Sequence, residues 1–365
     1  MKVLYVSSFD ESHKAGYYNA VMDRIKVLRR KRELDIVSLN FSKGRFSDNI
    51  DLNVHIPFFL CSKPVLRVMT ELYLLLWVLY FSIRFKSEVI HVHWAYPIGY
   101  AATVAGKIAK IPVVVTCHGS DIHTNPNAYK FIRSRTNACL KNAHSIMVVG
   151  HSLKNILIEN FSIPSSKIFV TPNGLDLKYY KPQAVSPKSS KDKVVVGFVG
   201  NLNTTKGADL LPSIYEKLTE LIDSKVKLVV VGDGPLKAEL TRIFEGEEVK
   251  FLGHIARQKV VDVIRECDLI VMPSRKEGFG IIALESFLLG TPCIAFKIPD
   301  LKDVFLHNLD LLVDSKNNDV NMFAYKCASV IRNLDFDLSQ EKYIDEFSLE
   351  SLIDLEVEKY YSAVS

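Results

Sequence analysis

A chain of 365 residues is longer than one hydrophobic core usually supports, so two domains are expected. Its composition, with 48% hydrophobic and 24% charged residues, is ordinary for a globular protein and argues against a disordered or collagen-like chain. The net charge of +5 is unevenly distributed, because residues 1–180 contain 23 Lys and Arg against 12 Asp and Glu. This excess of basic residues predicts an anionic partner for the first half. The sequence contains no nucleic-acid recognition module, which argues against nucleic acid as that partner.

The first half alternates short apolar runs with segments of helical period, beginning with a run at Met1–Ser8 that is too short for a signal peptide. Strands are expected at Val3–Ser7, Asp35–Leu39, Val89–His93, Pro112–Cys117, Ser145–Val149 and Lys167–Val170. Helices are expected at Tyr17–Lys31, Val65–Phe85, Ile98–Ala109, Ala128–Lys141 and Ser152–Asn160.

A polar segment rich in Pro, Ser and Lys at 181–192 predicts a linker. The alternation then restarts, with strands expected at Val194–Val199, Lys227–Val231, Val249–Leu252, Leu269–Met272, Cys293–Phe296 and Leu311–Val313. An amphipathic helix at about Leu349–Tyr361 ends the chain. This order favours an α/β fold with two doubly wound parallel sheets, whose ligands bind outside the carboxyl ends of the strands and in the cleft between the domains.

The cysteines are scattered and form no CxxC pair, which favours reduced structural thiols in the cytoplasm over disulfides. They are Cys61, Cys117, Cys139, Cys267, Cys293 and Cys327.

The most informative segment is Pro273–Glu285, in which Glu277 and Glu285 lie eight positions apart around a Gly-Phe-Gly turn. The apolar run Leu269–Met272 before it indicates a buried parallel strand, and an apolar helix follows it. A strand, a glycine turn and a helix place backbone N–H groups at a helix N-terminus, where anions bind. A carboxylate beside such a site suits a ligand with both negative charge and hydroxyls, such as a sugar nucleotide.

This segment resembles the Glu-x7-Glu signature of retaining glycosyltransferases of family 4, which have the GT-B fold. Further segments follow in the family's order, at Thr116–Asp121, Thr171–Asp176, Val196–Leu202 with Lys206 and Gly207, Val229–Leu236 and Val249–Gly253. The resemblance implies two Rossmann-like domains facing a central cleft. The acceptor would bind the domain at 1–180 and the donor the domain at 193–347, and a helix at 348–365 would cross back to the first domain.

The resemblance also implies roles for single residues. Lys206 would hold the diphosphate, Glu277 the hydroxyls of the transferred sugar, and His118 would lie near that sugar. Glu285 would bind the ribose. The loop Gly253–Arg257 would hold the base, although Arg257 could equally be a surface charge. The other donor-site residues would be Gly200, Asn201, Gly207, His254, Ile255, Gly278, Phe279, Gly280 and Ile281.

Asn201 departs from the family pattern, which has an arginine that grips the diphosphate at this position. An asparagine carries no charge and cannot form the bidentate fork of a guanidinium. Arg275 and Lys276 are candidates to replace that charge.

No metal and no other cofactor is expected. His91 and His93 alternate on one face of a strand, which favours packing or a place in the acceptor cleft over a metal site, because no acidic partner is placed beside them. Asp335 and Asp337 lie away from the donor motifs and are interpreted as surface residues. No nucleophile for double displacement emerges, and the family implies a front-face mechanism in which the leaving phosphate takes the acceptor proton.

The prediction is a cytoplasmic glycosyltransferase that moves a sugar with retention from a nucleotide-diphosphate sugar to a glycan or lipid-linked acceptor, in surface polysaccharide or glycolipid biosynthesis. Two alternatives stay open: a sugar-nucleotide epimerase and a non-catalytic GT-B partner subunit. Asn201 favours the subunit, as does Ile298–Asp303, where the family usually has a Gly-Gly turn. The presence of Lys206, Glu277 and Glu285 favours an enzyme.

The most apolar run, Val65–Lys86, has a charge-free core at Leu72–Ile83 that is shorter than the ~20 residues of a spanning helix. Its aromatic residues and flanking basic residues suit a peripheral position on the anionic inner face of a membrane, with added charge from the basic run Arg24–Arg32. Burial in the core of the first domain is the alternative, and both interpretations stay open.

Overall fold

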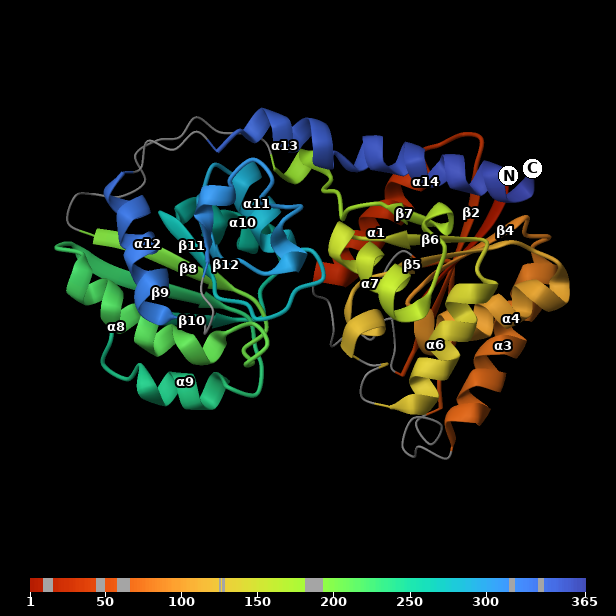
Figure 1. Cartoon of the computed structure of the whole chain (residues 1–365), viewed down its shortest axis with the longest axis horizontal. Helices are drawn as coiled ribbons and strands as arrows, with labels where there is room; N and C mark the ends of the chain where they lie inside the picture. The colour runs from red at the N-terminus through yellow and green to blue at the C-terminus, as the bar shows by residue number, and fades with distance from the viewer. Residues whose placement is uncertain are drawn as a thin grey trace. The chain divides into compact units, whose positions relative to one another are not determined.

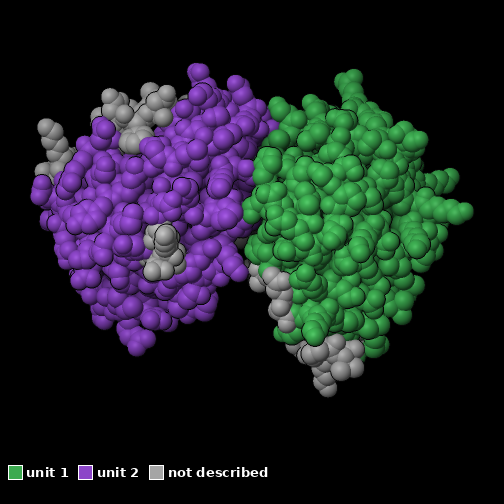
Figure 2. Space-filling view, in the orientation of Figure 1, with its two compact units in different colours: residues 1–174, 349–365 green, residues 175–348 purple. Residues whose placement is uncertain are grey.

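Figure 1 shows the computed structural model of the chain, which describes residues 1–8, 16–43, 50–57, 66–124, 126, 129–180, 193–314, 319–333 and 338–365. The chain divides into two compact units, one of residues 1–174 and 349–365 and one of residues 175–348 (Figure 2). The linker expected at 181–192 lies outside the described residues. Residues 175–180 group with the second unit, where the N–H of Leu175 donates to the carbonyl of Phe347 at 3.1 Å.

The first unit contains a seven-stranded sheet in the order β3-β2-β1-β4-β5-β6-β7, and every pairing in it is parallel. All residues of β4 and β5 are buried, as expected for a parallel sheet covered on both faces. The strands are β1 Lys2–Ser8, β2 Asp35–Ser42, β3 Leu52–His55, β4 Val89–His93, β5 Val113–Cys117, β6 Ser145–Val148 and β7 Ile168–Val170.

The helices of this unit lie on both faces of the sheet. The connection β1–α1–β2 runs toward one edge and β4–α4–β5 toward the other, so right-handed crossovers place α1 and α4 on opposite faces. Helix α1 packs against α14, while α3 packs against α4, and α4 against α6. The described helices are α1 Gly16–Leu28, α3 Arg67–Arg84, α4 Tyr100–Ala109, α6 Lys130–Asn142, α7 His151–Phe161 and α14 Leu349–Val364.

The second unit contains a six-stranded parallel sheet in the order β10-β9-β8-β11-β12-β13, so the strand order reverses between β8 and β11. Its strands are β8 Lys193–Val199, β9 Lys225–Val231, β10 Val249–Gly253, β11 Leu269–Met272, β12 Cys293–Phe296 and β13 Leu312–Val313. Its described helices are α8 Leu211–Leu221, α9 Lys237–Ile243, α10 Arg257–Glu266, α11 Ile281–Leu288, α12 Val320–Arg332 and α13 Gln340–Phe347.

The predicted α/β class with two doubly wound parallel sheets is confirmed, and each expected strand is present. The prediction missed β3. This strand has four residues, lies at the edge of its sheet, and buries only Val54, so it lacks the apolar run by which the other strands were recognised.

Helix α3 shows that the apolar run Val65–Lys86 is buried on one face only. Glu71, Leu74, Val78 and Ser82 are buried, whereas a second set of apolar side chains on this helix stays about half exposed. In the described ranges, no helix combines the length and the apolar character needed to cross a membrane.

The basic run Arg24–Arg32 is only in part the open cationic surface that the sequence predicted. Arg24 is only 2% exposed, so it cannot contribute charge to a surface. Acidic residues distant in sequence, two of them on α14, pair with three of the others. The ion pairs are Arg29 with Asp51, Arg30 with Glu350, and Lys31 with Asp354.

Candidate active site

The two principal loops of the predicted donor site follow the strands at which the order of the second sheet reverses. The loop 200–207 follows β8 and the loop 273–280 follows β11, and these two strands pair side by side. Ligands of open parallel sheets bind outside the carboxyl ends of the strands at such a switch point. The sheet topology therefore brings together two loops that are far apart in the sequence.

An ion pair joins the two loops. Nζ of Lys206 donates to Oε2 of Glu277 at 2.6 Å, and the hydroxyl of Ser274 donates to Oε1 at 2.7 Å. The side chain of Glu277 is 8% exposed, whereas that of Lys206 is 32% exposed. A carboxylate has about four lone-pair positions, so both oxygens can still accept hydrogen bonds from a ligand. A cation and an oriented carboxylate at one sheet edge suit a ligand that has both phosphate and hydroxyl groups.

Close backbone packing sets the position of Lys206. Gly207 has φ 70°, and a Cβ on it would lie 2.0 Å from the carbonyl oxygen of Pro273, so only glycine fits there. The N–H of Arg275 also donates to the carbonyl of Thr205 at 2.9 Å. The two loops are thus in backbone contact, and their functional side chains extend from this contact.

Glu285 lies in α11, is 6% exposed, and accepts a hydrogen bond from the hydroxyl of Tyr180. Nε of Arg257 donates to the same hydroxyl oxygen at 3.1 Å, and its guanidinium lies over the rings of Tyr179 and Tyr180 at 5.1 and 5.5 Å. Burial and the nearby charge of Glu285 raise the pKa of Tyr180, so its hydroxyl remains a donor. Arg257 is therefore part of a hydrogen-bonded series with Tyr180 and Glu285, and it is not a free surface charge.

Asn201 lies against the loop that follows β9. A Cβ on Gly234 would lie 2.4 Å from Oδ1 of Asn201. Arg275, a candidate to replace the missing arginine, donates through both terminal nitrogens to the carboxylate of Asp209, at 2.7 and 2.8 Å. This bidentate pair makes Arg275 a residue that fixes the loop, and Lys276 is the exposed cation beside it.

The other predicted donor-site residues lie in the loops around this edge. The N–H of Gly200 donates to the carbonyl of Val231 at 3.0 Å. His254 and Ile255 follow β10, with His254 exposed. Phe279 is 2% exposed and its ring lies 5.7 Å from that of Phe347, so its side chain belongs to the core. In the turn Gly278–Ile281, Phe279 therefore has only its backbone to offer a ligand.

In the first unit, Asp121 holds the loop that carries His118. Its Oδ1 accepts from the N–H groups of His118 and Gly119, both at 3.0 Å, and its Oδ2 accepts from the N–H of Ala95 at 3.0 Å. Asp121 is 1% exposed. No sequence pattern predicts these three contacts of Asp121, although an aspartate shortly after a glycine is a turn signal.

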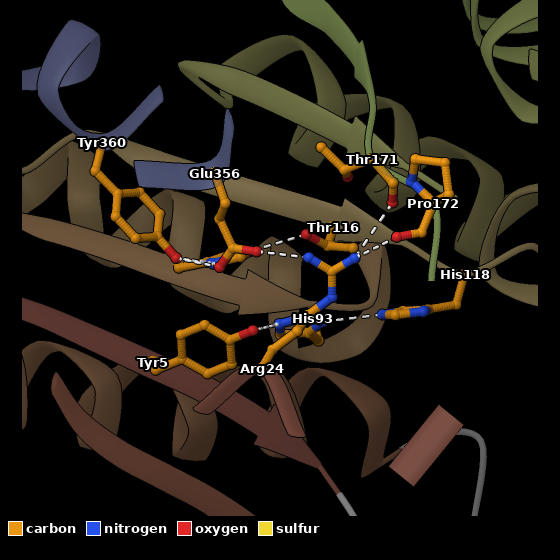
Figure 3. Close-up of polar contacts among 10 residues, drawn as sticks. Tyr5, Arg24, His93, Thr116, His118, Thr171, Pro172, Glu356 and Tyr360 are labelled. Carbon is orange, nitrogen blue, oxygen red and sulfur yellow. Dashed lines mark hydrogen bonds and ion pairs between the residues drawn. The ribbon is translucent and has the colours of Figure 1, made fainter. Parts of the chain in front are cut away.

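A chain of hydrogen bonds runs from His118 into the sheet (Figure 3). Nε2 of His118 lies 2.9 Å from Nδ1 of His93, and Nε2 of His93 lies 2.6 Å from the hydroxyl oxygen of Tyr5. A neutral imidazole donates through one nitrogen and accepts through the other. The tautomer of His118 is thereby coupled to the hydroxyl orientation of Tyr5, a dependence that the sequence did not reveal.

A second buried network surrounds Arg24. Its guanidinium donates to Oε2 of Glu356 at 2.7 Å and to the carbonyls of Thr171 at 3.4 Å and Pro172 at 2.6 Å (Figure 3). The hydroxyl of Tyr360 donates to Oε1 of Glu356 at 2.5 Å. Helices α1 and α14 and the segment after β7 therefore meet at one buried charge pair.

These surroundings fix the protonation states. Burial, then the charges of His91, His118 and Arg24, hold the pKa of His93 well below its usual range. Burial, Arg24 and His91 lower the pKa of His118 in the same way. Burial alone would raise the pKa of Glu356, but His91, Arg24 and the hydrogen bond from Tyr360 outweigh it and lower the pKa to about 2. Near pH 7 the chain through His118 and His93 is therefore neutral, and Glu356 is ionised.

The packing interpretation of His91 and His93 agrees with these contacts. Nε2 of His91 lies 2.7 Å from Oγ1 of Thr116, and its Nδ1 lies 2.5 Å from the Tyr360 hydroxyl. Within the described ranges, no three His, Cys, Asp or Glu side chains are grouped to hold a metal ion. Asp335 and Asp337 lie outside the described residues.

Two family models match the chain in succession. Residues 21–179 match Glycosyltransferase Family 4, and residues 181–346 match Glycosyl transferases group 1. The chain is 30% identical over 237 residues to TuaC of Bacillus subtilis (strain 168), which is named as a glycosyltransferase of teichuronic acid biosynthesis. That match covers 63% of this chain and 58% of TuaC, and the chain spans about three fifths of the length of the curated relatives it matches.

Solved structures share the whole fold. A glycosyltransferase from Rickettsia africae superposes with a TM-score of 0.76 at 18% identity, covering 100% of this chain and 99% of the other. Anabaena HepE, solved in complex with UDP and glucose, superposes with a TM-score of 0.74 at 18% identity, covering 99% and 100%. The two parallel sheets, the loops at the switch point and the two successive family matches lead to one conclusion: the chain belongs to glycosyltransferase family 4, with the GT-B fold.

Proposed function

We propose that this chain is a retaining glycosyltransferase that moves a sugar from a nucleotide-diphosphate sugar to a glycan or lipid-linked acceptor. The observation that carries the proposal is the ion pair of Lys206 and Glu277 at the switch point of the second sheet, in a chain of family 4. The two charges match the two parts of such a donor, because the lysine suits the diphosphate and the carboxylate suits the sugar hydroxyls.

In the proposed reaction, Lys206 stabilises the negative charge that grows on the diphosphate as the glycosidic bond breaks. Glu277 accepts hydrogen bonds from the transferred sugar, and Glu285, oriented by Tyr180, accepts them from the ribose. The leaving phosphate oxygen takes the proton of the acceptor hydroxyl while the new bond forms on the same face, so the configuration is retained. The protein contributes position and electrostatics, without a nucleophile of its own.

His118 would meet the transferred sugar as a neutral hydrogen-bonding group. Its low pKa keeps it neutral, and Asp121 and His93 fix its backbone and its ring. A neutral imidazole can form a hydrogen bond with a sugar hydroxyl without adding a positive charge.

The likeness to HepE, solved with UDP and glucose, supports a nucleoside diphosphate donor. The name of TuaC supports surface polysaccharide assembly as the setting. We place the reaction in the cytoplasm, at the inner face of the membrane, where nucleotide sugars would meet lipid-linked acceptors. Transfer is expected to need no metal and to continue in the presence of a chelator.

The test starts from a thermal-shift panel of nucleotide-diphosphate sugars, since a ligand that binds only the folded state raises the melting temperature with concentration. The stabilising donor is then used in transfer assays. Glu277→Gln should lower transfer by about 10²–10³-fold while the melting temperature of the free protein changes little. Near-normal turnover by Glu277→Gln would remove the residue from the donor site.

Two other functions make different predictions for the same assays. A sugar-nucleotide epimerase would convert the donor without an acceptor, whereas a transferase leaves its sugar intact apart from slow hydrolysis. A non-catalytic subunit, favoured by Asn201, would turn over no donor alone and would gain activity only when its partner is added. Transfer of the sugar to an acceptor by the purified chain alone would support the proposed function over both alternatives.

A further inference from the structure

One face of α3 exposes a continuous apolar stripe. Its outer stripe consists of Val68 (53% exposed), Met69 (52%), Leu72 (54%), Leu76 (55%), Tyr80 (54%) and Ile83 (62%). At 100° per residue these six side chains fall within an arc of roughly 120°, and they run along about 23 Å of helix. Globular proteins bury most such surfaces, and a contiguous one marks an interaction site.

The inner face of the same helix is already occupied. Leu74, Val78 and Ser82 are at most 1% exposed, and the carboxylate of Glu71 pairs with Nε of Arg135 at 3.3 Å. The outer stripe is therefore not the result of a loosely packed helix. It is the second apolar face of a helix whose first face anchors it to the unit.

The exposed charged residues of α3 and α4 are basic. Arg84 and Lys86 follow its end, and Lys107 and Lys110 lie on and just after the neighbouring helix α4; all four are exposed. Within Arg67–Arg84 and Tyr100–Ala109 the sequence contains one acidic residue, the buried Glu71. An anionic partner would meet these cations without like-charge repulsion.

Aromatic side chains flank the stripe. The rings of Tyr73 and Trp77 lie 6.3 Å apart, those of Trp77 and Tyr80 5.9 Å, and those of Trp77 and Phe81 5.5 Å. Tyrosine and tryptophan have an apolar body and a polar tip, which suits the boundary between headgroups and acyl chains. A basic helix with an apolar stripe and such rings fits a lipid surface better than a polar macromolecule.

We propose that the outer stripe of α3, with its basic neighbours, docks the first unit on an anionic lipid bilayer. The helix lies in the interface with its apolar side chains among the upper acyl segments. The headgroup phosphates meet Arg84, Lys86, Lys107 and Lys110. This proposal adds a membrane partner to the proposed transfer reaction, and it rests on that reaction for the biological role of the docking. The basic run Arg24–Arg32 takes no part, since most of its charges pair with acidic residues of the same chain.

The test is flotation of the full chain with vesicles of phosphatidylcholine alone or mixed with phosphatidylglycerol, at low and high salt. The wild type should float with the mixed vesicles, less at high salt, and little with phosphatidylcholine alone. Leu72→Gln combined with Leu76→Gln should lower the partition coefficient about tenfold or more, because two apolar side chains are lost from the interface. Glutamine keeps the helix propensity of leucine, so the fold should persist.

Matched controls separate the stripe from general effects. Met322→Gln with Tyr325→Gln removes two apolar side chains, 49% and 62% exposed, from α12 of the second unit and should change nothing. Arg30→Gln with Lys31→Gln should leave binding intact, whereas Lys107→Gln with Lys110→Gln should weaken it at low salt.

No flotation of the wild type, or equal flotation of the Leu72/Leu76 variant, would overturn the docking proposal. So would a concentration-dependent dimer in analytical ultracentrifugation that the same variant abolishes, since the stripe would then be covered by a second copy. Vesicle binding needs no donor and no turnover, and Glu277→Gln should float normally. Failure of the docking is thus distinguishable from failure of the proposed transfer reaction.

Discussion

At the residue scale, the contact between Lys206 and Glu277 lies at the centre of the proposed donor site. The two side chains lie 2.6 Å apart, but Lys206 is the more exposed partner and has three N–H donors. It can therefore keep one hydrogen bond to the carboxylate and turn the others toward a phosphate. Glu277, fixed by Ser274 as well, keeps its direction.

Lys206→Ala should lower the rate of transfer, with a loss of about 2–4 kcal/mol in transition-state stabilisation. Because the two residues are in contact, Lys206→Ala combined with Glu277→Gln should lose less than the sum of the single losses. Steady-state kcat/KM of the four proteins measures the coupling. Lys225→Ala, at an exposed lysine where β9 begins, serves as the control and should behave as the wild type. Strict additivity would contradict a shared site.

Asn201→Arg should tighten the binding of a nucleoside diphosphate, because a guanidinium beside the β8 loop adds a bidentate charged contact to the phosphates. Isothermal titration calorimetry should record at least a several-fold lower Kd, while Asn201→Gln, which adds length without charge, should not. The contact of Asn201 with Gly234 places the new side chain at the right loop. Unchanged affinity would mean that the phosphates lie elsewhere.

At the element scale, α14 is held to α1 by a buried ion pair as well as by apolar packing. Arg24 and Glu356 are 2% and 0% exposed, and Ile353, Val357 and Tyr360 pack in the same cluster as Val21 and Ile25. A buried pair is strongly destabilised when one partner is removed, because the remaining charge stays buried.

Glu356→Ala should therefore lower the free energy of unfolding by about 3–5 kcal/mol. Replacing both partners, as Arg24→Met with Glu356→Met, should cost less than Glu356→Ala alone. Urea unfolding measures both. The exposed pair of Lys31 and Asp354 gives the control, since Asp354→Ala should cost about 1 kcal/mol or less. An equal cost for Asp354→Ala and Glu356→Ala would contradict this account.

At the scale of the whole molecule, the first unit should lose stability in acid. In the folded state the pKa of His93 lies well below the unfolded value of ~6.5. Below pH ~6.5 the unfolded chain therefore binds a proton at this histidine that the folded chain does not bind, and the free energy of unfolding falls. His118 acts in the same direction. The contribution of Glu356, with a pKa of about 2, is lost only at lower pH, below ~4.5.

Between pH 7 and pH 5 the free energy of unfolding should fall by about 2 kcal/mol for each such histidine. Both tryptophans, Trp77 and Trp94, lie in the first unit, so their fluorescence reports its unfolding. His93→Gln should flatten the pH dependence by about one proton, and His254→Gln, at an exposed histidine of the second unit, should leave it unchanged. A flat profile for the wild type would mean that His93 is protonated in the folded state.

The amino-acid sequence by itself determined the fold class and indicated the residues of the proposed donor site. Buried parallel strands are recognisable as apolar runs. Lys206 and Glu277 lie in loops that contain glycines, and Glu285 lies in the helix that follows the second loop. Local signals of this kind survive without tertiary contacts, because they depend on hydrophobic burial and on backbone conformation. The edge strand β3 was missed since it buries too little to leave such a signal.

Only the tertiary structure decided which polar groups meet. Tyr180 joins Glu285 across 105 residues, and Arg24 joins Glu356 across 332, and neither pair has a local sequence pattern. The tertiary structure also decided the exposure of α3 and of the basic run Arg24–Arg32. The composition of both segments predicts attraction to an anionic membrane. Packing on the sheet determines which face of α3 stays exposed, and long-range ion pairs determine which basic side chains are neutralised. The sequence determines the chemistry of each side chain. Its partners and its exposure follow from the topology that brings distant strands and helices together.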